Sequence, residues 1–150
     1  MPTLRVTTLA DQNDGGASGG LSLRDAILTA NTDRNNNYTI QLQGGRTYTL
    51  TLNGPEEDAA ATGDLDILGN ITIRASGQPA TITAQGLGDR VFDVLRNRLS
   101  LNNVVVTGGS ADALSAPAPG GGIRANSDTQ LNLTNSTVRD NIAGGVRRHF

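Results

Sequence analysis

The chain has 150 residues, enough for one domain with a hydrophobic core, and it has no cysteine, which excludes disulfides, thiolate catalysis and cysteine-ligated metals. Its formal net charge is −2, so no overall positive field attracts it to nucleic acid. It contains no apolar run long enough to span a membrane, and the sequence as given begins without a signal peptide. Its 19 glycines and 3% aromatic residues favour short strands and tight turns over helices.

The first predicted elements are a strand from Leu4 to Leu9 and a turn-rich loop from Asp11 to Gly20. The loop lacks the closing glutamate of an EF-hand. We therefore expect Asp11 and Asp14 to be solvated turn residues and not Ca²⁺ ligands.

A helix is predicted from Ser22 to about Thr32. Ser22 and Asp25 have the spacing of a capping box, with Arg24 between them. Apolar residues at helical spacing give the helix one buried face. A single amphipathic helix ahead of a strand array is expected to lie across the first coil, where it covers an open strand edge and the end of the core. The residues of the apolar stripe are Leu23, Ala26, Ile27 and Ala30.

Acidic residues gather in the middle of the chain. Two predicted strands between Tyr38 and Leu52 are followed by an acidic loop from Pro55 to Thr62. Asp64 and Asp66 then alternate with apolar residues, which places both carboxylates on one outer strand face.

The second pair, Asp89 and Asp93, comes one coil further on and flanks Arg90. One interpretation of Asp64 and Asp66, with Glu56, Glu57 and Asp58 nearby, is a Ca²⁺ site or an acid/base pair acting on a sugar, and Asp89 and Asp93 could join such a cluster. The other is a solvated outer face, which we favour because carboxylates on an exposed strand face need no metal. The candidate ligand or metal residues are Asp64, Asp66, Asp89 and Asp93, and no catalytic residue is assigned.

Further strands are predicted at 71–75, 81–84 and 91–94, and the stretch that begins at Val91 is then repeated. The repeat keeps its apolar positions and one asparagine at an offset of 32 residues, a pattern typical of units that stack on one another. Each copy has an alternating strand, an asparagine suited to a bend, and a second short strand. The matched pairs are Val91 and Ile123, Leu99 and Leu131, Leu101 and Leu133, Asn103 and Asn135, and Val106 and Val138.

This pattern predicts an all-β fold, a right-handed parallel β-helix with one N-terminal capping helix. The alternative is an ordinary sandwich with two hairpins that resemble each other by chance. We expect a single domain over residues 1–150, with the strand, loop and helix in 1–37, coils in 38–146 and a tail in 147–150. The proline- and glycine-rich stretch from Ser110 to Gly122 is expected to be a loop between the two repeat copies.

The stretch Leu21 to Ile27 resembles the C-S-L-R-E-A-I segment of the CSLREA-type bacterial proteins. Tyr38 to Leu50 and Glu57 to Ile67 are similar to two further passages of that family. The resemblance implies a right-handed parallel β-helix of the pectin-lyase-like type in a secreted or cell-surface protein. Leu21 replaces the family's cysteine, so a thiol or disulfide role at that position is excluded.

The function expected from these observations is a non-catalytic structural or adhesive module of a bacterial surface or secreted protein. The alternative is a carbohydrate-binding or polysaccharide-cleaving module, since enzymes of this architecture cleave pectin-like polysaccharides. The expected partners are a polysaccharide and a second copy bound through an open C-terminal coil, with no nucleic acid. No cofactor is expected, although Ca²⁺ is kept as an alternative at the carboxylates.

Overall fold

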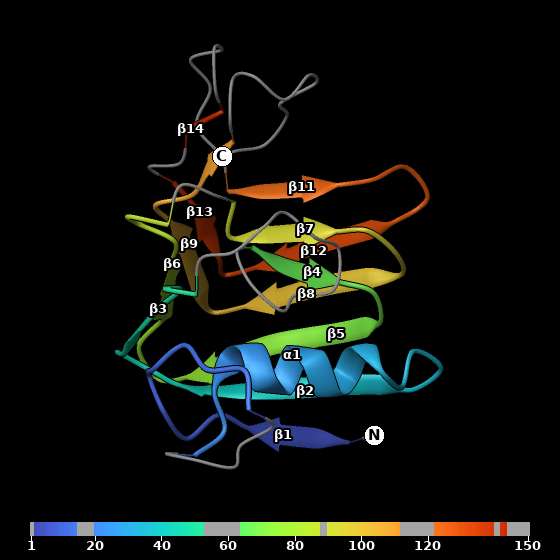
Figure 1. The fold of residues 1–150 in the computed structure, drawn as a ribbon, viewed down its shortest axis with the longest axis horizontal. Helices are drawn as coiled ribbons and strands as arrows, with labels where there is room; N and C mark the ends of the chain where they lie inside the picture. Colours follow the sequence, from blue (N-terminus) through green and yellow to red (C-terminus); the bar gives the residue numbers. More distant parts are fainter. Residues whose placement is uncertain are drawn as a thin grey trace.

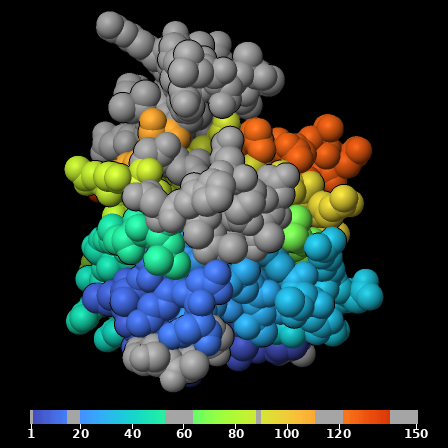
Figure 2. All heavy atoms as spheres, viewed as in Figure 1, coloured from blue at the N-terminus to red at the C-terminus, as the bar shows by residue number. Residues whose placement is uncertain are grey.

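The computed structural model describes residues 2–14, 20–52, 64–87, 90–111, 122–139 and 142–143. Within them the chain forms a parallel β-helix, as the sequence predicts, with successive coils stacked along one axis (Figure 1). The colour bands of Figure 2 follow one another in sequence order along this axis, from blue to orange. The fold is therefore a solenoid in which each coil contacts its neighbours.

Three parallel sheets, which we call A, B and C, form the walls of the solenoid. Sheet A contains, in spatial order, β1 (Thr3–Arg5), β2 (Asn37–Gln43), β5 (Asn70–Ser76), β8 (Arg98–Asn102) and β12 (Gln130–Thr134). Sheet B contains β3 (Thr47–Thr49), β6 (Ala80–Thr83), β9 (Val104–Thr107) and β13 (Thr137–Val138). Sheet C contains β4 (Leu65–Ile67), β7 (Phe92–Val94) and β11 (Ile123–Ala125). A separate pair joins β10 (Ser110–Ala111) to β14 (Ile142–Ala143).

Aliphatic side chains from successive coils form continuous columns inside the solenoid. One column of sheet A runs from Ile40 through Ile73 and Leu101 to Leu133, each paired in register with the next. The exposed fractions of the first three side chains are 0%, 0% and 1%, whereas Leu133 in the edge strand β12 is 45% exposed. Burial in these columns drives the stacking, and the column ends where no further described strand covers it.

Asparagine makes the bends between sheets A and B, as predicted. Asn103 and Asn135 have φ angles of 63° and 48°, and Gly77 makes the equivalent bend one coil earlier with a φ of 79°. The Asn103 side-chain amide donates to the carbonyls of Ala75 and Gly77, at 3.1 and 3.0 Å. Asparagine is suited to these positions because it tolerates left-handed backbone and bonds to nearby carbonyls.

The repeat register is confirmed in sheets A and B but is wrong by one residue in sheet C. Leu99 pairs with Leu131 and Val106 with Val138, at the predicted offset of 32. Ile123, however, pairs with Phe92 and not with Val91. The cause is that the connection from β11 to β12 is one residue longer than that from β7 to β8, which the aligned apolar residues concealed.

The helix α1 (Leu23–Asn31) forms where it was predicted but lies differently. It packs beside β4 and in front of β2, in the position that a strand of sheet C would otherwise occupy (Figure 1). The Asn31 side chain bonds to the backbone beside β4 as a neighbouring strand would. Its amide donates to the Asp66 carbonyl at 2.8 Å and accepts from the Leu68 N–H at 3.0 Å. The helix thus covers the edge of sheet C, as expected, but it belongs to the wall of the solenoid and not to a lid across its end.

Three further predictions concern the ends of elements. The first strand stops at Arg5, well before the predicted Leu9, because the chain turns away at Val6 and Thr7 toward the helix. The predicted loop from Ser110 begins with β10, and residues 112–121 lie outside the described part of the chain, as do 53–63 and the tail at 147–150.

The described residues include no helix of the length and apolarity that a membrane span requires.

Candidate functional site

Sheet C brings three of the four predicted carboxylates together. Asp66 in β4 is the register partner of Asp93 in β7, so their side chains lie side by side on adjacent strands. Asp64 directly precedes β4, and one carboxylate oxygen from each of these three residues lies within 4.8 Å of the others. Asp89, the fourth candidate, lies outside the described residues. We call Asp64, Asp66 and Asp93 the acidic cluster.

The prediction that Asp64 and Asp66 lie on a solvated outer face is wrong, and Asp93 is buried as well. Asp64, Asp66 and Asp93 are 6%, 0% and 2% exposed. Every residue of β4 and of β7 is buried, so both faces of these short strands are covered. The alternating sequence pattern correctly separates the two faces of the strand, but it contains no information on whether the polar face is covered.

Arginine neutralises one end of the acidic cluster. Arg124 in β11 is the register partner of Asp93, and its guanidinium binds both carboxylate oxygens, with Nε donating to Oδ1 at 2.9 Å and Nη2 donating to Oδ2. The Arg124 side chain is 30% exposed and that of Asp93 is 3% exposed. Arg90, which precedes β7, is also buried, at 5% exposure. Bidentate pairing of this kind fixes geometry as well as charge.

This arrangement suits a structural role better than a chemical one. The spacing of the three carboxylates would allow one cation to touch all of them, because Ca²⁺–oxygen distances are about 2.4 Å. The two oxygens of Asp93 are already bound by Arg124, however, so a cation would compete with a guanidinium. A polysaccharide also has no access to carboxylates that are so nearly buried. The ion pair of Asp93 with Arg124 instead links two consecutive strands of sheet C, β7 and β11, and Asp66 lies beside it on β4.

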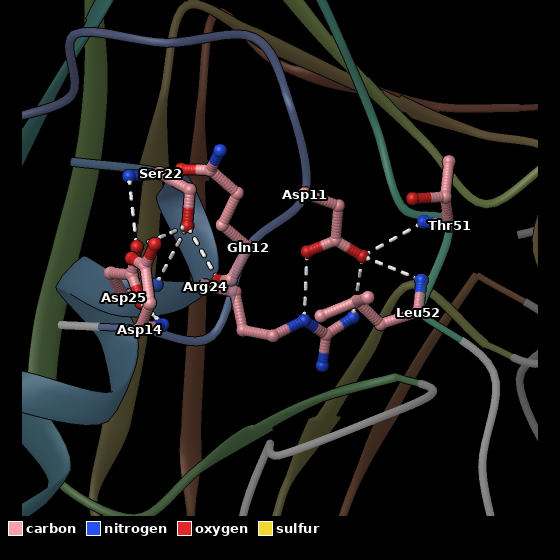
Figure 3. Close-up of polar contacts among 8 residues, drawn as sticks. All are labelled: Asp11, Gln12, Asp14, Ser22, Arg24, Asp25, Thr51 and Leu52. Carbon is pink, nitrogen blue, oxygen red and sulfur yellow. Dashed lines mark hydrogen bonds and ion pairs between the residues drawn. The ribbon is translucent and has the colours of Figure 1, made fainter. Parts of the chain in front are cut away.

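The predicted structural residues Ser22 and Asp25 form the capping box of α1. The Ser22 hydroxyl accepts from the Asp25 N–H at 3.0 Å, and the Asp25 carboxylate accepts from the Ser22 N–H at 3.3 Å. The same carboxylate accepts from the Asp14 N–H at 2.9 Å, and the Ser22 hydroxyl donates to the Gln12 carbonyl at 2.8 Å. The N-terminal loop is therefore tied to the first turn of the helix (Figure 3).

The sequence predicts that Asp11 is a solvated turn residue, and this prediction is wrong. The structure buries its carboxylate. It binds the Arg24 guanidinium through two hydrogen bonds of 2.8 and 3.0 Å, and the exposed fractions of the Arg24 and Asp11 side chains are 0% and 1%. Its Oδ2 atom also accepts from the N–H groups of Thr51 and Leu52, at 2.8 and 3.0 Å (Figure 3). Asp11 therefore joins the loop, the helix and the chain that follows β3. The sequence contains no signal of this pairing, because the burial of Arg24 is known only from the structure.

The outer face of sheet A is the second candidate site. Its strands alternate buried apolar with outward polar residues, and strands in register stack the outward residues into ladders. Two hydrogen bonds join outward side chains of adjacent strands. Asn132 donates to Ser100 at 3.3 Å within one ladder, and Gln41 donates to Ser76 at 3.2 Å between two different ladders. The three longest ladders are Thr3, Thr39, Thr72, Ser100 and Asn132; Arg5, Gln41, Arg74, Asn102 and Thr134; and Asn37, Asn70, Arg98 and Gln130.

A groove lies at one end of this face. It has a volume of about 620 Å³ and forms where β1 ends while β2 and β5 continue. Its polar lining consists of Arg5, Thr7, Gln41, Gln43 and Ser76. Polar side chains with open space beside them make this end of sheet A accessible to a ligand, in contrast to the acidic cluster.

Fold and site together define the class of this protein as a parallel β-helix with a helix built into its first coil. Comparison with known proteins adds no relative, since no protein-family model, curated protein or solved structure matches the chain. Function must therefore be argued from the two candidate sites themselves.

Proposed function

We propose that the chain is a non-catalytic adhesive module of a bacterial surface or secreted protein, with sheet A as the surface that contacts other molecules. The observation that carries this proposal is the contrast between the two sites. The carboxylates suited to chemistry are buried and one of them is bound by Arg124, whereas the accessible surface is a flat array of amide, hydroxyl and guanidinium groups. The secreted or surface location follows the resemblance of Leu21 to Ile27 to the CSLREA-type proteins.

The competing function is cleavage of a polysaccharide at the acidic cluster, with or without Ca²⁺. The test is an assay for new reducing ends and for unsaturated products on acidic and neutral polysaccharides, with Ca²⁺ and with a chelator. We expect no product above the blank, and no Ca²⁺-dependent rise in thermal stability. Product formation that Asp66→Asn abolishes while Asp128→Asn, an exposed control in a bend, leaves it unchanged would refute the non-catalytic proposal.

A second part of the proposal is self-association through the last described coil. Strand β12 is the edge of sheet A, and its Leu133 is 45% exposed at the end of a column whose inner members are buried. A second copy is the natural occupant, since pairing along this edge continues both the sheet and the aliphatic column.

We expect sedimentation to show concentration-dependent association of the unmodified chain. Leu133→Lys should shift the equilibrium to monomer, because a charge at the edge opposes both burial and strand pairing. Leu9→Lys is the matched control, since Leu9 is also an exposed leucine, at 36%, but it follows β1, the opposite edge strand of sheet A. A chain that stays monomeric at high concentration, or a Leu133→Lys variant that associates as well as the unmodified chain, would contradict this part of the proposal.

A further inference from the structure

The outer face of sheet A carries no acidic residue on its described strands, although the chain has 14 acidic and 12 basic residues. Its outward positions are threonine, serine, asparagine, glutamine and three arginines. Every described strand of the sheet obeys this rule, from β1 to β12. A face with positive charge only, on a chain of net charge −2, is a local electrostatic feature that composition alone does not explain.

The arginines of this face have no carboxylate partner among the described residues. Arg5 and Arg74 are exposed, and no hydrogen bond or ion pair of their side chains is found in the described part of the chain. Arg98 is half-buried, and its Nε atom is buried without a hydrogen-bond partner. By contrast, Arg24 and Arg124 each bind a carboxylate in two places. The guanidinium groups of Arg5 and Arg74 are thus available to an external anion.

Two of these arginines belong to one ladder, which ends in the groove. Arg5 and Arg74 flank Gln41 on adjacent strands, so their backbones lie about 10 Å apart, twice the spacing between neighbouring strands. Arg5 and Gln41 line the groove of about 620 Å³ together with Ser76. The pattern is therefore a cation, an amide and a second cation in a line, with hydroxyl groups beside them.

We propose that this face binds an acidic polysaccharide, whose carboxylate or sulfate groups pair with Arg5 and Arg74 while its hydroxyl groups bond to Gln41, Asn102 and the neighbouring threonines. The main argument is that the positive charges of this face complement the negative charges of such a polymer. The low density of those positive charges favours a polysaccharide over a nucleic acid. A nucleic acid has one negative charge per ~1.7 Å of duplex and needs a dense cationic or aromatic surface. Three arginines spread over five strands, with amides and hydroxyls between them, suit a polymer with sparse charges and many hydroxyls.

This inference rests on the proposed adhesive function and specifies its ligand. The experiment measures binding of the full chain to immobilised alginate, a carboxylated glycan, to dextran sulfate, a sulfated one, and to uncharged dextran and duplex DNA. We expect binding to one or both acidic glycans, weakening as salt is raised, and little binding to uncharged dextran or DNA. The two acidic arms decide whether the anion is a carboxylate or a sulfate.

Arg5→Gln and Arg74→Gln should each lower the affinity about threefold, and the double variant about tenfold, the size expected for exposed charged contacts. Arg96→Gln is the matched control, because Arg96 is an exposed arginine in the bend before β8 and is not part of the sheet. The thermal unfolding temperature should be unchanged in all of these variants, since these side chains form no hydrogen bond or ion pair with any described residue. Equal losses in Arg96→Gln, equal binding of uncharged dextran, or a preference for DNA would overturn the inference.

The outcomes separate the inference from the proposed function. If the acidic glycans do not bind while the chain still adheres to bacterial or host surfaces, the inference fails and the adhesive function stands. If the glycans bind and are shortened, the non-catalytic function fails. Binding without shortening that the two sheet A variants weaken supports both.

Discussion

Replacement of Asp11 by alanine is expected to destabilise the fold by about 3–5 kcal/mol, the range for breaking a buried ion pair by removing one partner. The variant leaves the Arg24 guanidinium, 0% exposed, without its carboxylate and removes the acceptor of the Thr51 and Leu52 N–H groups. Urea unfolding followed by circular dichroism measures the loss, since the chain has no tryptophan for fluorescence.

Two controls show whether the ion pair itself is responsible. Asp14→Ala changes an exposed acidic residue of the same loop and should cost no more than about 1 kcal/mol. The double variant Asp11→Ala with Arg24→Met removes both charges and should recover part of the loss, because the buried charge is no longer uncompensated. Equal stability of Asp11→Ala and Asp14→Ala would mean that the buried pair does not hold the N-terminal loop, the helix and the first coil together.

The second large effect is expected from a pair of leucines in equivalent positions. Leu101→Ala should cost about 2–5 kcal/mol, because the side chain is 1% exposed and its loss leaves a cavity inside the column. Leu133→Ala, its register partner in β12, should cost less than about 1.5 kcal/mol, because that side chain is 45% exposed. Both are measured by urea unfolding at concentrations where the chain is monomeric. Equal losses would contradict the position of β12 as the edge strand of sheet A, covered by no further described strand.

The sequence predicts the repeated parts of the fold well. The apolar positions of the two copies and the asparagine bends determine sheets A and B, because burial and left-handed backbone each restrict the residue types that fit. The cap and the apolar stripe predict the helix, and the residues of the stripe are buried as expected. The one-residue error at Ile123 arose where a connection changed length without changing the apolar pattern.

The sequence predicts the environment of the polar residues less well. Asp11, Asp64 and Asp66 have polar neighbours and alternating patterns that are typical of exposed residues, yet the structure buries all three carboxylates. Their burial depends on segments that are distant in the sequence, such as Arg24 for Asp11 and β7 for Asp66, and no local pattern contains that information. The same reason explains Asn31, whose side chain takes the place of a strand backbone beside β4.

The outer face of sheet A also could not be read from any one segment. Each strand contributes only a few outward residues, and none of them is unusual for a strand. The absence of carboxylates from the described strands emerges only when they are placed in register, which joins residues as far apart in sequence as Arg5 and Thr134 in one ladder. The candidate binding surface is thus a property of the stacked coils and not of a motif.

The most direct test of sheet A as the binding surface is a titration of isotopically labelled protein with a short alginate oligosaccharide, in the presence of Ca²⁺, followed by amide chemical shifts. We predict that the shifted resonances belong to Arg5, Gln41, Arg74 and their neighbours on sheet A. Shifts confined to Asp64, Asp66 and Asp93 would contradict this assignment, because they would place the ligand at the acidic cluster that we describe as a buried link between coils.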